Sequence, residues 1–246
     1  MAAAHLLKGE ALPKLTGILM FPAMLLGPSV AGIVLTRLLD GPAGMRDLLS
    51  RMGRIRVPLR WYGVLLIPSC VILVILLSLN ALVSPAYAPN RFLVGLAFGI
   101  PAGFLEEIGW MGFAYPRMLQ KLRGLTAAVL LGLLWGIWHM PVIDFLGTVT
   151  PHGKWWFPFF AAFTAAMTAV RILIAWLYCN TGSVLLCQFT HVCSTGALVI
   201  FSPVHVSAGQ EVLWYAVYAV ALWLLIFVLS QAVSGFPCRE KLPRVG

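Results

Sequence analysis

Charged residues are scarce in this chain of 246 residues: they make up only 10% of it, whereas 61% of the residues are hydrophobic. The mean hydropathy of +0.93 is far above that of a domain with a polar, water-facing surface. This composition excludes an ordinary soluble enzyme. It predicts an all-α, polytopic membrane protein that forms a single integral membrane domain over residues 1–246.

CxxC motifs, the pattern of a signal peptide and internal repeats are not seen in the sequence either. None of the five cysteines forms a CxxC pair, and an odd number in mostly apolar segments argues against a disulfide framework, so we interpret them as packing residues. The N-terminal stretch lacks the apolar core and cleavage pattern of a signal peptide, so the first hydrophobic run is expected to remain as a membrane helix. The absence of matching halves argues against a transporter.

Acidic residues are few, with 8 Asp and Glu against 17 Lys and Arg. In a soluble protein, such an excess of basic residues would suggest a nucleic-acid partner. Here most basic residues fall in short loops, where they orient membrane helices. We therefore expect no nucleic-acid partner and a lipid bilayer instead. The loops within 37–60, 117–123 and 239–244 carry most of the charge, which places them and the C-terminus in the cytoplasm and the N-terminus outside.

Apolar runs of about 20 residues divide the chain into about seven predicted membrane helices. They lie at about 15–37, 61–85, 92–115, 123–141, 156–178, 183–202 and 210–233. Between the first two runs, the polar stretch from Arg37 to Arg60 has leucines between its charges, which predicts a short amphipathic helix on the membrane surface.

Two adjacent carboxylates, Glu106 and Glu107, lie inside the third apolar run. One ionised side chain at the centre of a bilayer costs about 2.5–3.5 kcal/mol, so membrane carboxylates usually face a polar cavity and usually mark function. Because two like charges in low dielectric do not readily ionise together, we expect the pair to share a proton or to recruit a cation. Asp144 and Glu211 lie near the ends of spans, where we interpret them as solvated.

Two further helices each carry a histidine at membrane depth. His139 follows Trp135 by one turn in the fourth run, and His191 precedes Thr195 by one turn in the sixth. Each histidine taken singly is more typical of an interhelical hydrogen bond, and Trp110 and Trp135 are more typical of packing. Together with the glutamates, however, the histidines suit either a divalent metal site or a metal-free site in which a carboxylate activates water. His5, His152 and His205 fall in loops or tails and are assigned no role.

Three motifs in this order, EEIGWMGFAYPRM, WGIWHMP and LLCQFTHVCST, resemble those of the CAAX prenyl protease and abortive-infection family of intramembrane endopeptidases. The resemblance covers about residues 92–202, taken as the catalytic core. It implies hydrolysis of a peptide bond in a membrane-associated peptide or protein substrate. It also implies a multi-pass protein, which we expect in the plasma membrane of a bacterium.

The resemblance implies a role for each matched residue. Glu106 would activate a water, while His139 and His191 would hold that water or stabilise the oxyanion, with Thr195 in support. Glu107 would be structural or would tune Glu106. Family members have been described both as metalloproteases and as glutamate proteases. The resemblance therefore does not decide whether the site binds a divalent metal such as zinc, for which Glu106, His139 and His191 would be the ligands.

The chain departs from the family pattern at two positions. Met111 stands where an Arg is expected four residues after Glu107, and Thr195 stands where an Asn is expected four residues after His191. Arg171 is the one basic residue placed within a predicted helix, which makes it the candidate replacement. Thr195 lacks the second donor of an amide, so oxyanion stabilisation would be weaker. The alternative function is therefore a catalytically impaired family member that acts as a membrane immunity or scaffolding protein.

Overall fold

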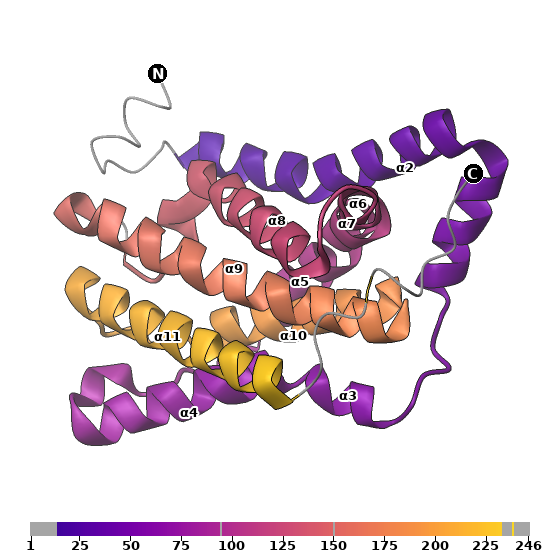
Figure 1. Ribbon diagram of the computed structural model, residues 1–246. Coiled ribbons are helices and arrows are strands. Elements are labelled where there is room, and N and C mark those ends of the chain that lie inside the picture. The colour runs from indigo at the N-terminus through magenta and orange to yellow at the C-terminus, as the bar shows by residue number, and fades with distance from the viewer. Residues whose placement is uncertain (1–13, 94, 150, 233–237, 239–246) are drawn as a thin grey trace.

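The computed structural model describes residues 14–93, 95–149, 151–232 and 238. The protein is 83% helical, and the described residues contain no strand. The helices are α2 (Lys14–Met52), α3 (Arg60–Val64), α4 (Ile67–Leu82), α5 (Gly95–Pro101), α6 (Glu107–Gly109), α7 (Tyr115–Leu119), α8 (Gly124–Trp138), α9 (Trp156–Thr181), α10 (Val184–Phe201) and α11 (Ala208–Ala232). This architecture confirms the predicted all-α membrane bundle (Figure 1).

All seven predicted spans are helical, but they are not equal. Five helices among the described residues are long and apolar enough to cross a membrane: Met20–Met52, Arg60–Leu82, Gly153–Thr181, Val184–Phe201 and Ala208–Gln231. The predicted span at 123–141 is the shorter α8, which gives way to the 3-10 helix η4 (Met140–Phe145). The predicted span at 92–115 is an interrupted helix that contains the two glutamates.

A helix is present in the polar stretch after residue 37, as the part of α2 that follows a kink and runs to Met52. Gly41 has a φ of 60° and precedes Pro42, so α2 turns there into a second arm (Figure 1). Leu48 in this arm is only 1% exposed. The arm therefore packs against the bundle rather than lying free beside it.

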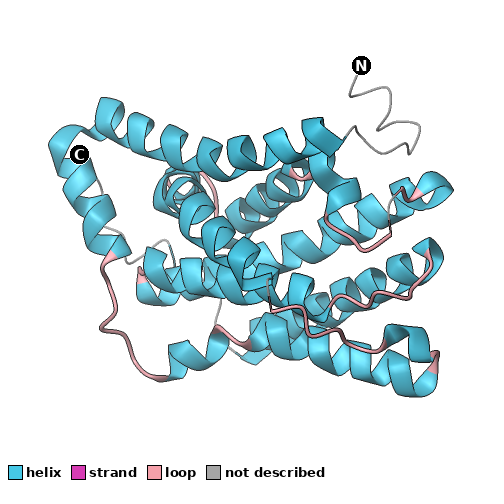
Figure 2. Cartoon of the chain, turned by 180° about the vertical axis from the view of Figure 1, so that it is seen from behind, coloured by secondary structure: helices cyan, strands magenta, loops and turns pink. Residues whose placement is uncertain are grey.

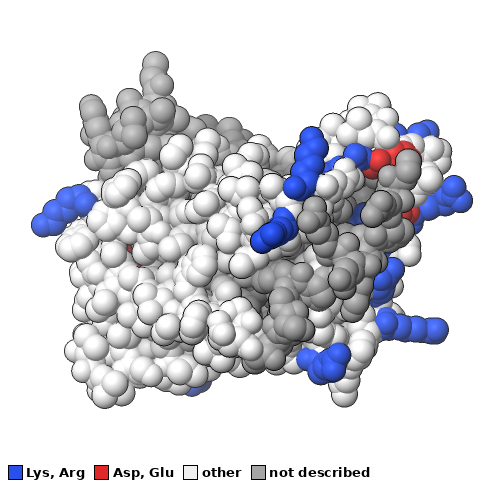
Figure 3. Space-filling view, in the orientation of Figure 1, with Lys and Arg blue, Asp and Glu red and all other residues white. Residues whose placement is uncertain are grey.

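Loops and charges distinguish the two ends of the bundle. The described parts of the connections α4–α5, α8–α9 and α10–α11 gather at one end, which lies opposite the second arm of α2 and which we call the opposite end (Figure 2). The second arm of α2, the α7–α8 connection and the α9–α10 connection lie at the other end, which we call the basic end. Figure 3 shows most of the visible Lys and Arg at the basic end.

One disulfide contradicts the interpretation of the cysteines as packing residues. Cys179, near the end of α9, is bonded to Cys238, and their Cα atoms are 4.7 Å apart. Cys70, Cys187 and Cys193 are free. Cys179 and Cys238 are 59 positions apart in the sequence. The spacing of the cysteines therefore does not predict their bond.

The interpretation of Glu211 as a solvated residue is also wrong. Its side chain is fully buried, and its carboxylate accepts hydrogen bonds from the backbone N–H groups of Thr148 and Val149 at 2.8 and 3.0 Å. His152 lies 3.2 Å from the same carboxylate and is 2% exposed. Glu211 thus attaches the α8–α9 connection to α11. The side chain of Asp144 lies outside the described part of the chain.

Candidate active site

The two glutamates lie on a helix whose regular hydrogen bonding is interrupted twice. Between α5 and α7 the chain forms two π-helical segments, η2 (Ala102–Glu106) and η3 (Trp110–Ala114), on either side of the short α6. Such segments occur frequently at functional sites, because they change which side chains face the protein interior. Here both neighbouring carboxylates are buried, with Glu106 3% and Glu107 0% exposed.

Side chains from neighbouring helices compensate for the interruption. Gln188 of α10 donates to the carbonyl of Phe104 at 2.8 Å, and Ser29 of α2 donates to the carbonyl of Leu105. Backbone groups without partners are costly in an apolar environment, so these two bonds stabilise the interrupted geometry. Both residues are missing from the sequence-based site. Each is a polar side chain within a predicted membrane span, which is the signal that the sequence offers.

Close contacts between backbones place this helix against both neighbours. A Cβ on Gly103 would lie 2.6 Å from the carbonyl oxygen of Gln188 in α10. A Cβ on Gly109 would lie 2.2 Å from the carbonyl oxygen of Pro28 in α2. Small residues permit such contacts between membrane helices. The glutamates are thus held between α2 and α10.

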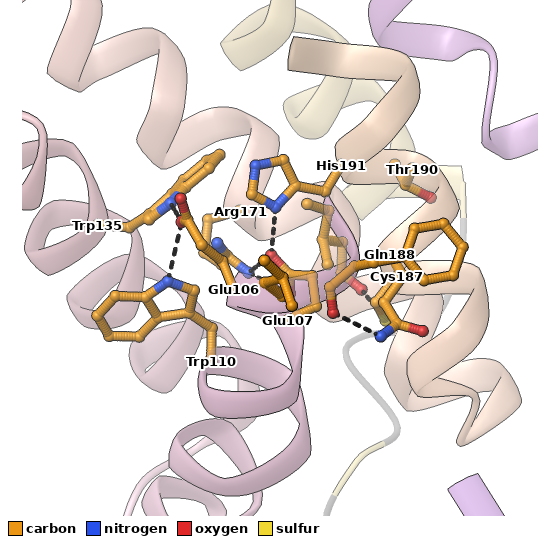
Figure 4. Close-up of polar contacts among 12 residues, drawn as sticks. Glu106, Glu107, Trp110, Trp135, Arg171, Cys187, Gln188, Thr190 and His191 are labelled. Carbon is orange, nitrogen blue, oxygen red and sulfur yellow. Dashed lines mark hydrogen bonds and ion pairs between the residues drawn. The ribbon is translucent and has the colours of Figure 1, made fainter. Parts of the chain in front are cut away.

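Glu107 forms a buried ion pair with the predicted replacement cation. The Nη1 atom of Arg171 lies 2.8 and 2.7 Å from the two carboxylate oxygens, and Nδ1 of His191 lies 2.7 Å from Oε1 (Figure 4). The guanidinium also lies 4.2 Å from the ring centre of Trp135. Of the two expected solutions to crowded charge, this structure has the recruited cation. The expectation that Arg171 substitutes for the missing Arg at position 111 agrees with these contacts.

Glu106 is held through only one of its two oxygens. Its Oε2 accepts hydrogen bonds from the indole N–H groups of Trp135 at 2.9 Å and Trp110 at 3.2 Å (Figure 4). No hydrogen bond from the described residues reaches Oε1. The two tryptophans therefore do more than pack, contrary to the interpretation from sequence. The spacing of four residues between Glu106 and Trp110 is the signal that was available.

Both histidines are oriented through Nδ1. His139 lies at the C-terminal end of α8, and its Nδ1 is 2.6 Å from the carbonyl oxygen of Trp135. Because a carbonyl only accepts, this nitrogen carries the proton and Nε2 is the basic nitrogen. His191 uses Nδ1 for Glu107 in the same way. The ring of Trp135 contacts both histidine rings, with centroids 5.3 Å from His139 and 4.9 Å from His191.

Four of the five predicted site residues line one cavity of about 670 Å³: Glu106, His139, His191 and Thr195. Thr195 is half-buried. Glu107 is not part of the lining and lies behind His191. The rest of the lining is mostly apolar and comes from α2, α5, η4, the end of α10 and the loops at the opposite end. The structure therefore brings together residues from three helices that are up to 89 positions apart, from Glu106 to Thr195.

The conditional metal ligands do not form a ligand set. Among the described residues, no three His, Cys, Asp or Glu side chains converge closely enough to hold a metal ion. Glu106, His139 and His191 line a common cavity, and the indole of Trp135 contacts both imidazoles. We derive no chemical step through a metal.

The fold and the site define a polytopic helical membrane protein with an enclosed glutamate–histidine site beside a largely apolar cavity. Residues 88–197 match the family model described as type II CAAX prenyl endopeptidase Rce1-like. A curated relative from Methanococcus maripaludis, named CAAX prenyl protease 2, is 27% identical over 139 residues. That alignment covers 51% of this chain and 50% of the relative, so the chain spans about half the length of the relative that it matches. The resemblance to CAAX prenyl proteases is thus confirmed over the segment that contains every predicted site residue.

Proposed function

We propose that this protein is an intramembrane endopeptidase that hydrolyses a peptide bond of a membrane-associated substrate. The observation that carries the proposal is that one carboxylate oxygen of Glu106 has no partner among the described residues while Glu106 lines a cavity with two oriented histidines. A general base must reach the water that it deprotonates, and a carboxylate oxygen without a hydrogen-bond partner, on a residue that lines a cavity, supports this role for Glu106. The similarity to CAAX prenyl proteases over residues 88–197 supports the same reaction class.

In the proposed mechanism Glu106 accepts a proton from a water in the cavity, and that water attacks the substrate carbonyl. The tryptophan N–H groups hold the carboxylate in position. His191 and His139 assist by hydrogen bonding to the water or, when protonated, to the oxyanion. Thr195 contributes a hydroxyl on the same wall. Glu107 does not touch the reacting atoms in this scheme, and it positions His191 as carboxylates commonly position histidines.

The alternative is a catalytically impaired relative that serves as a membrane immunity or scaffolding protein. Thr195 in place of an amide favours this alternative, because a hydroxyl has one donor and a shorter reach. Met111 no longer argues strongly for it. Arg171 supplies the cation that position 111 lacks.

A comparison of new peptide N-termini tests the proposal without a guess about the substrate. Membranes from cells that produce the natural chain are compared with membranes from cells that produce Glu106→Gln at the same level. Cleavages that disappear with Glu106→Gln are expected. Identical profiles across several growth conditions would instead favour the impaired relative. A third culture with Glu211→Gln controls for the loss of a buried carboxylate as such.

A further inference from the structure

We propose that residues 54–60, which read RIRVPLR, form a surface that binds the headgroups of anionic phospholipids. We call it the RIRVPLR surface. It runs from the second arm of α2 into α3, on the outer side of the basic end (Figure 1). None of these residues is among the described residues that line the cavity, so lipid binding here is independent of the proposed endopeptidase function.

The RIRVPLR surface carries positive charge that no described carboxylate neutralises. Its three arginines, Arg54, Arg56 and Arg60, are exposed, and none of them forms an ion pair with another described residue. The carboxylates nearest to them in the sequence, Asp40 and Asp47, each pair with a different arginine. Because the planar guanidinium group matches the geometry of phosphate oxygens, the three arginines are suited to bind phosphate headgroups.

Apolar side chains alternate with these arginines. Ile55 is 58% exposed and Leu59 is 83% exposed. At a membrane interface such side chains reach the acyl chains, while the neighbouring cations stay with the phosphates. A soluble anion would leave both apolar side chains in water. The alternation therefore favours a phospholipid as the ligand of this surface.

Hydrogen bonds hold the RIRVPLR surface at the level where membrane spans end. The Ser183 hydroxyl donates to the carbonyl of Arg54 at 2.7 Å, and Nη1 of Arg54 donates to the carbonyl of Thr181 at 3.4 Å. Both bonds attach the surface to the turn between α9 and α10, where two candidate membrane spans meet. A third candidate span, Arg60–Leu82, begins at the last residue of the surface. Cations at the ends of spans lie at the level of the lipid headgroups.

Aromatic residues support the same surface from within. The Arg60 guanidinium lies 5.5 Å from the ring centre of Trp61, and Trp61 packs edge-to-face against Trp176 with ring centres 5.1 Å apart. Tryptophan is enriched at membrane–water interfaces. The Tyr62 hydroxyl also donates to the carbonyl of Ile55. These contacts order the segment before a lipid binds, which lowers the entropic cost of binding.

The opposite end provides a matched comparison. Arg91 and Lys154 are exposed cations of that end, and Lys154 lies 5.8 Å from the ring centre of Trp155. They belong to two different connections, so they lack the alternation of charged and apolar residues. Removing both changes the net charge as much as removing two arginines from the RIRVPLR surface.

Lipid binding to the purified full-length protein tests the proposal without any substrate. Native mass spectrometry in mild detergent measures the affinity for phosphatidylglycerol, which is anionic, and for phosphatidylcholine, which has no net charge. The natural chain is expected to prefer phosphatidylglycerol. Arg56→Gln/Arg60→Gln should lower this preference by about fivefold for each arginine, whereas Arg91→Gln/Lys154→Gln should keep it. Equal losses in the two variants, or no loss in either, would overturn the proposal.

Two further variants separate the contribution of charge from that of apolar contact. Arg56→Lys/Arg60→Lys keeps both charges, so it should retain most of the preference for phosphatidylglycerol. Loss of the preference in this variant would overturn the role assigned to charge. Ile55→Ser/Leu59→Ser should weaken the binding of both lipids alike, because apolar contacts do not depend on the charge of the headgroup. Unchanged affinities would overturn the assignment to a lipid and favour a soluble anion.

Thermal unfolding then identifies the ligand and its place. A lipid that binds the folded protein raises the unfolding midpoint, and the gain from phosphatidylglycerol should largely disappear in about 1 M sodium chloride, where the screening length is about 3 Å. Inorganic phosphate at the same concentration should give no gain; an equal gain would overturn the lipid in favour of free phosphate. Glu106→Gln should show the same gain as the natural chain. Loss of the gain in Glu106→Gln would place the lipid in the cavity and overturn the proposal.

Discussion

The described residues contain two buried carboxylate–histidine pairs, and they differ in what surrounds them. Glu107 lies 2.7 Å from His191 at the centre of the bundle, and Glu211 lies 3.2 Å from His152 at the opposite end. All four side chains are at most 2% exposed. The residue types alone do not distinguish the two pairs, because a carboxylate and a histidine are typical of a hydrolytic site in both cases.

The partners of each carboxylate show why the pairs are not equivalent. Glu211 accepts backbone N–H groups from Thr148 and Val149, so it fixes a loop, and the His152 ring stacks on Phe159 with centroids 4.0 Å apart. Glu107 instead pairs with a cation and holds a histidine that lines the cavity. Of the two pairs, Glu107–His191 is therefore the one whose histidine lines the cavity together with a second carboxylate, Glu106.

The largest difference is expected when the two histidines are removed in turn. His191→Ala should lower the cleavage rate by at least about 100-fold, because it removes an oriented proton-transfer group from the cavity. His152→Ala should leave the rate per folded molecule nearly unchanged, although it leaves a gap beside Phe159. The rate is measured on the substrate found by terminus profiling, in proteoliposomes with matched amounts of folded protein. Equal losses would mean that both pairs take part in the reaction.

Removing the cation tests the second difference between the pairs. Arg171→Leu should lower the free energy of unfolding by about 3–5 kcal/mol, since it leaves Glu107 buried without its compensating charge. Adding Met111→Arg to this variant should recover much of the loss, because position 111 lies one turn after Glu107. Arg56→Leu, which removes an exposed guanidinium, serves as the control.

Unfolding in mild detergent is the measurement for these three variants. A stable Arg171→Leu protein would show that Glu107 takes up a proton when its cation is removed. A double variant no more stable than Arg171→Leu would show that position 111 does not reach the carboxylate.

Much of this site could be predicted from the sequence because burying charge in a membrane is costly. The glutamates, His139 and His191 are ionisable groups within apolar runs, and Arg171 is the one basic residue within a predicted helix. The seven helical spans follow from hydropathy in the same way. These predictions need only residues that are close together in the sequence, within one helical turn or one membrane span. A single sequence is enough to make them.

The remaining features depend on contacts between distant residues. The π-helical segments around Glu106 exist where Gln188 and Ser29 are present to bond the backbone. Glu211 was misread because its partners come from a loop 62 or 63 positions away. The bond between Cys179 and Cys238 likewise needs the whole bundle to bring its ends together.

A smaller effect is expected from the loop carboxylate itself. Glu211→Gln keeps one acceptor oxygen but loses the charge, so the free energy of unfolding should fall by about 1–3 kcal/mol. Because Gly147 and Thr148 line the cavity, KM should rise several-fold with kcat unchanged. Glu107→Gln is the matched control and should lower kcat instead. Steady-state kinetics separate the two, and a fall in kcat alone for Glu211→Gln would contradict a purely positional role.

The smallest effect concerns the one position on the cavity wall where the chain departs from the family pattern. Thr195→Asn supplies a longer side chain with two N–H donors, so the cleavage rate should rise by up to about tenfold if the oxyanion lies near this wall. Thr195→Val should lower it. Thr190→Val is the control on the same helix, because the Thr190 hydroxyl bonds to the carbonyl of Leu186 and is not part of the cavity lining. A lower rate for Thr195→Asn would mean that the oxyanion is stabilised elsewhere, with the two histidines as the remaining donors.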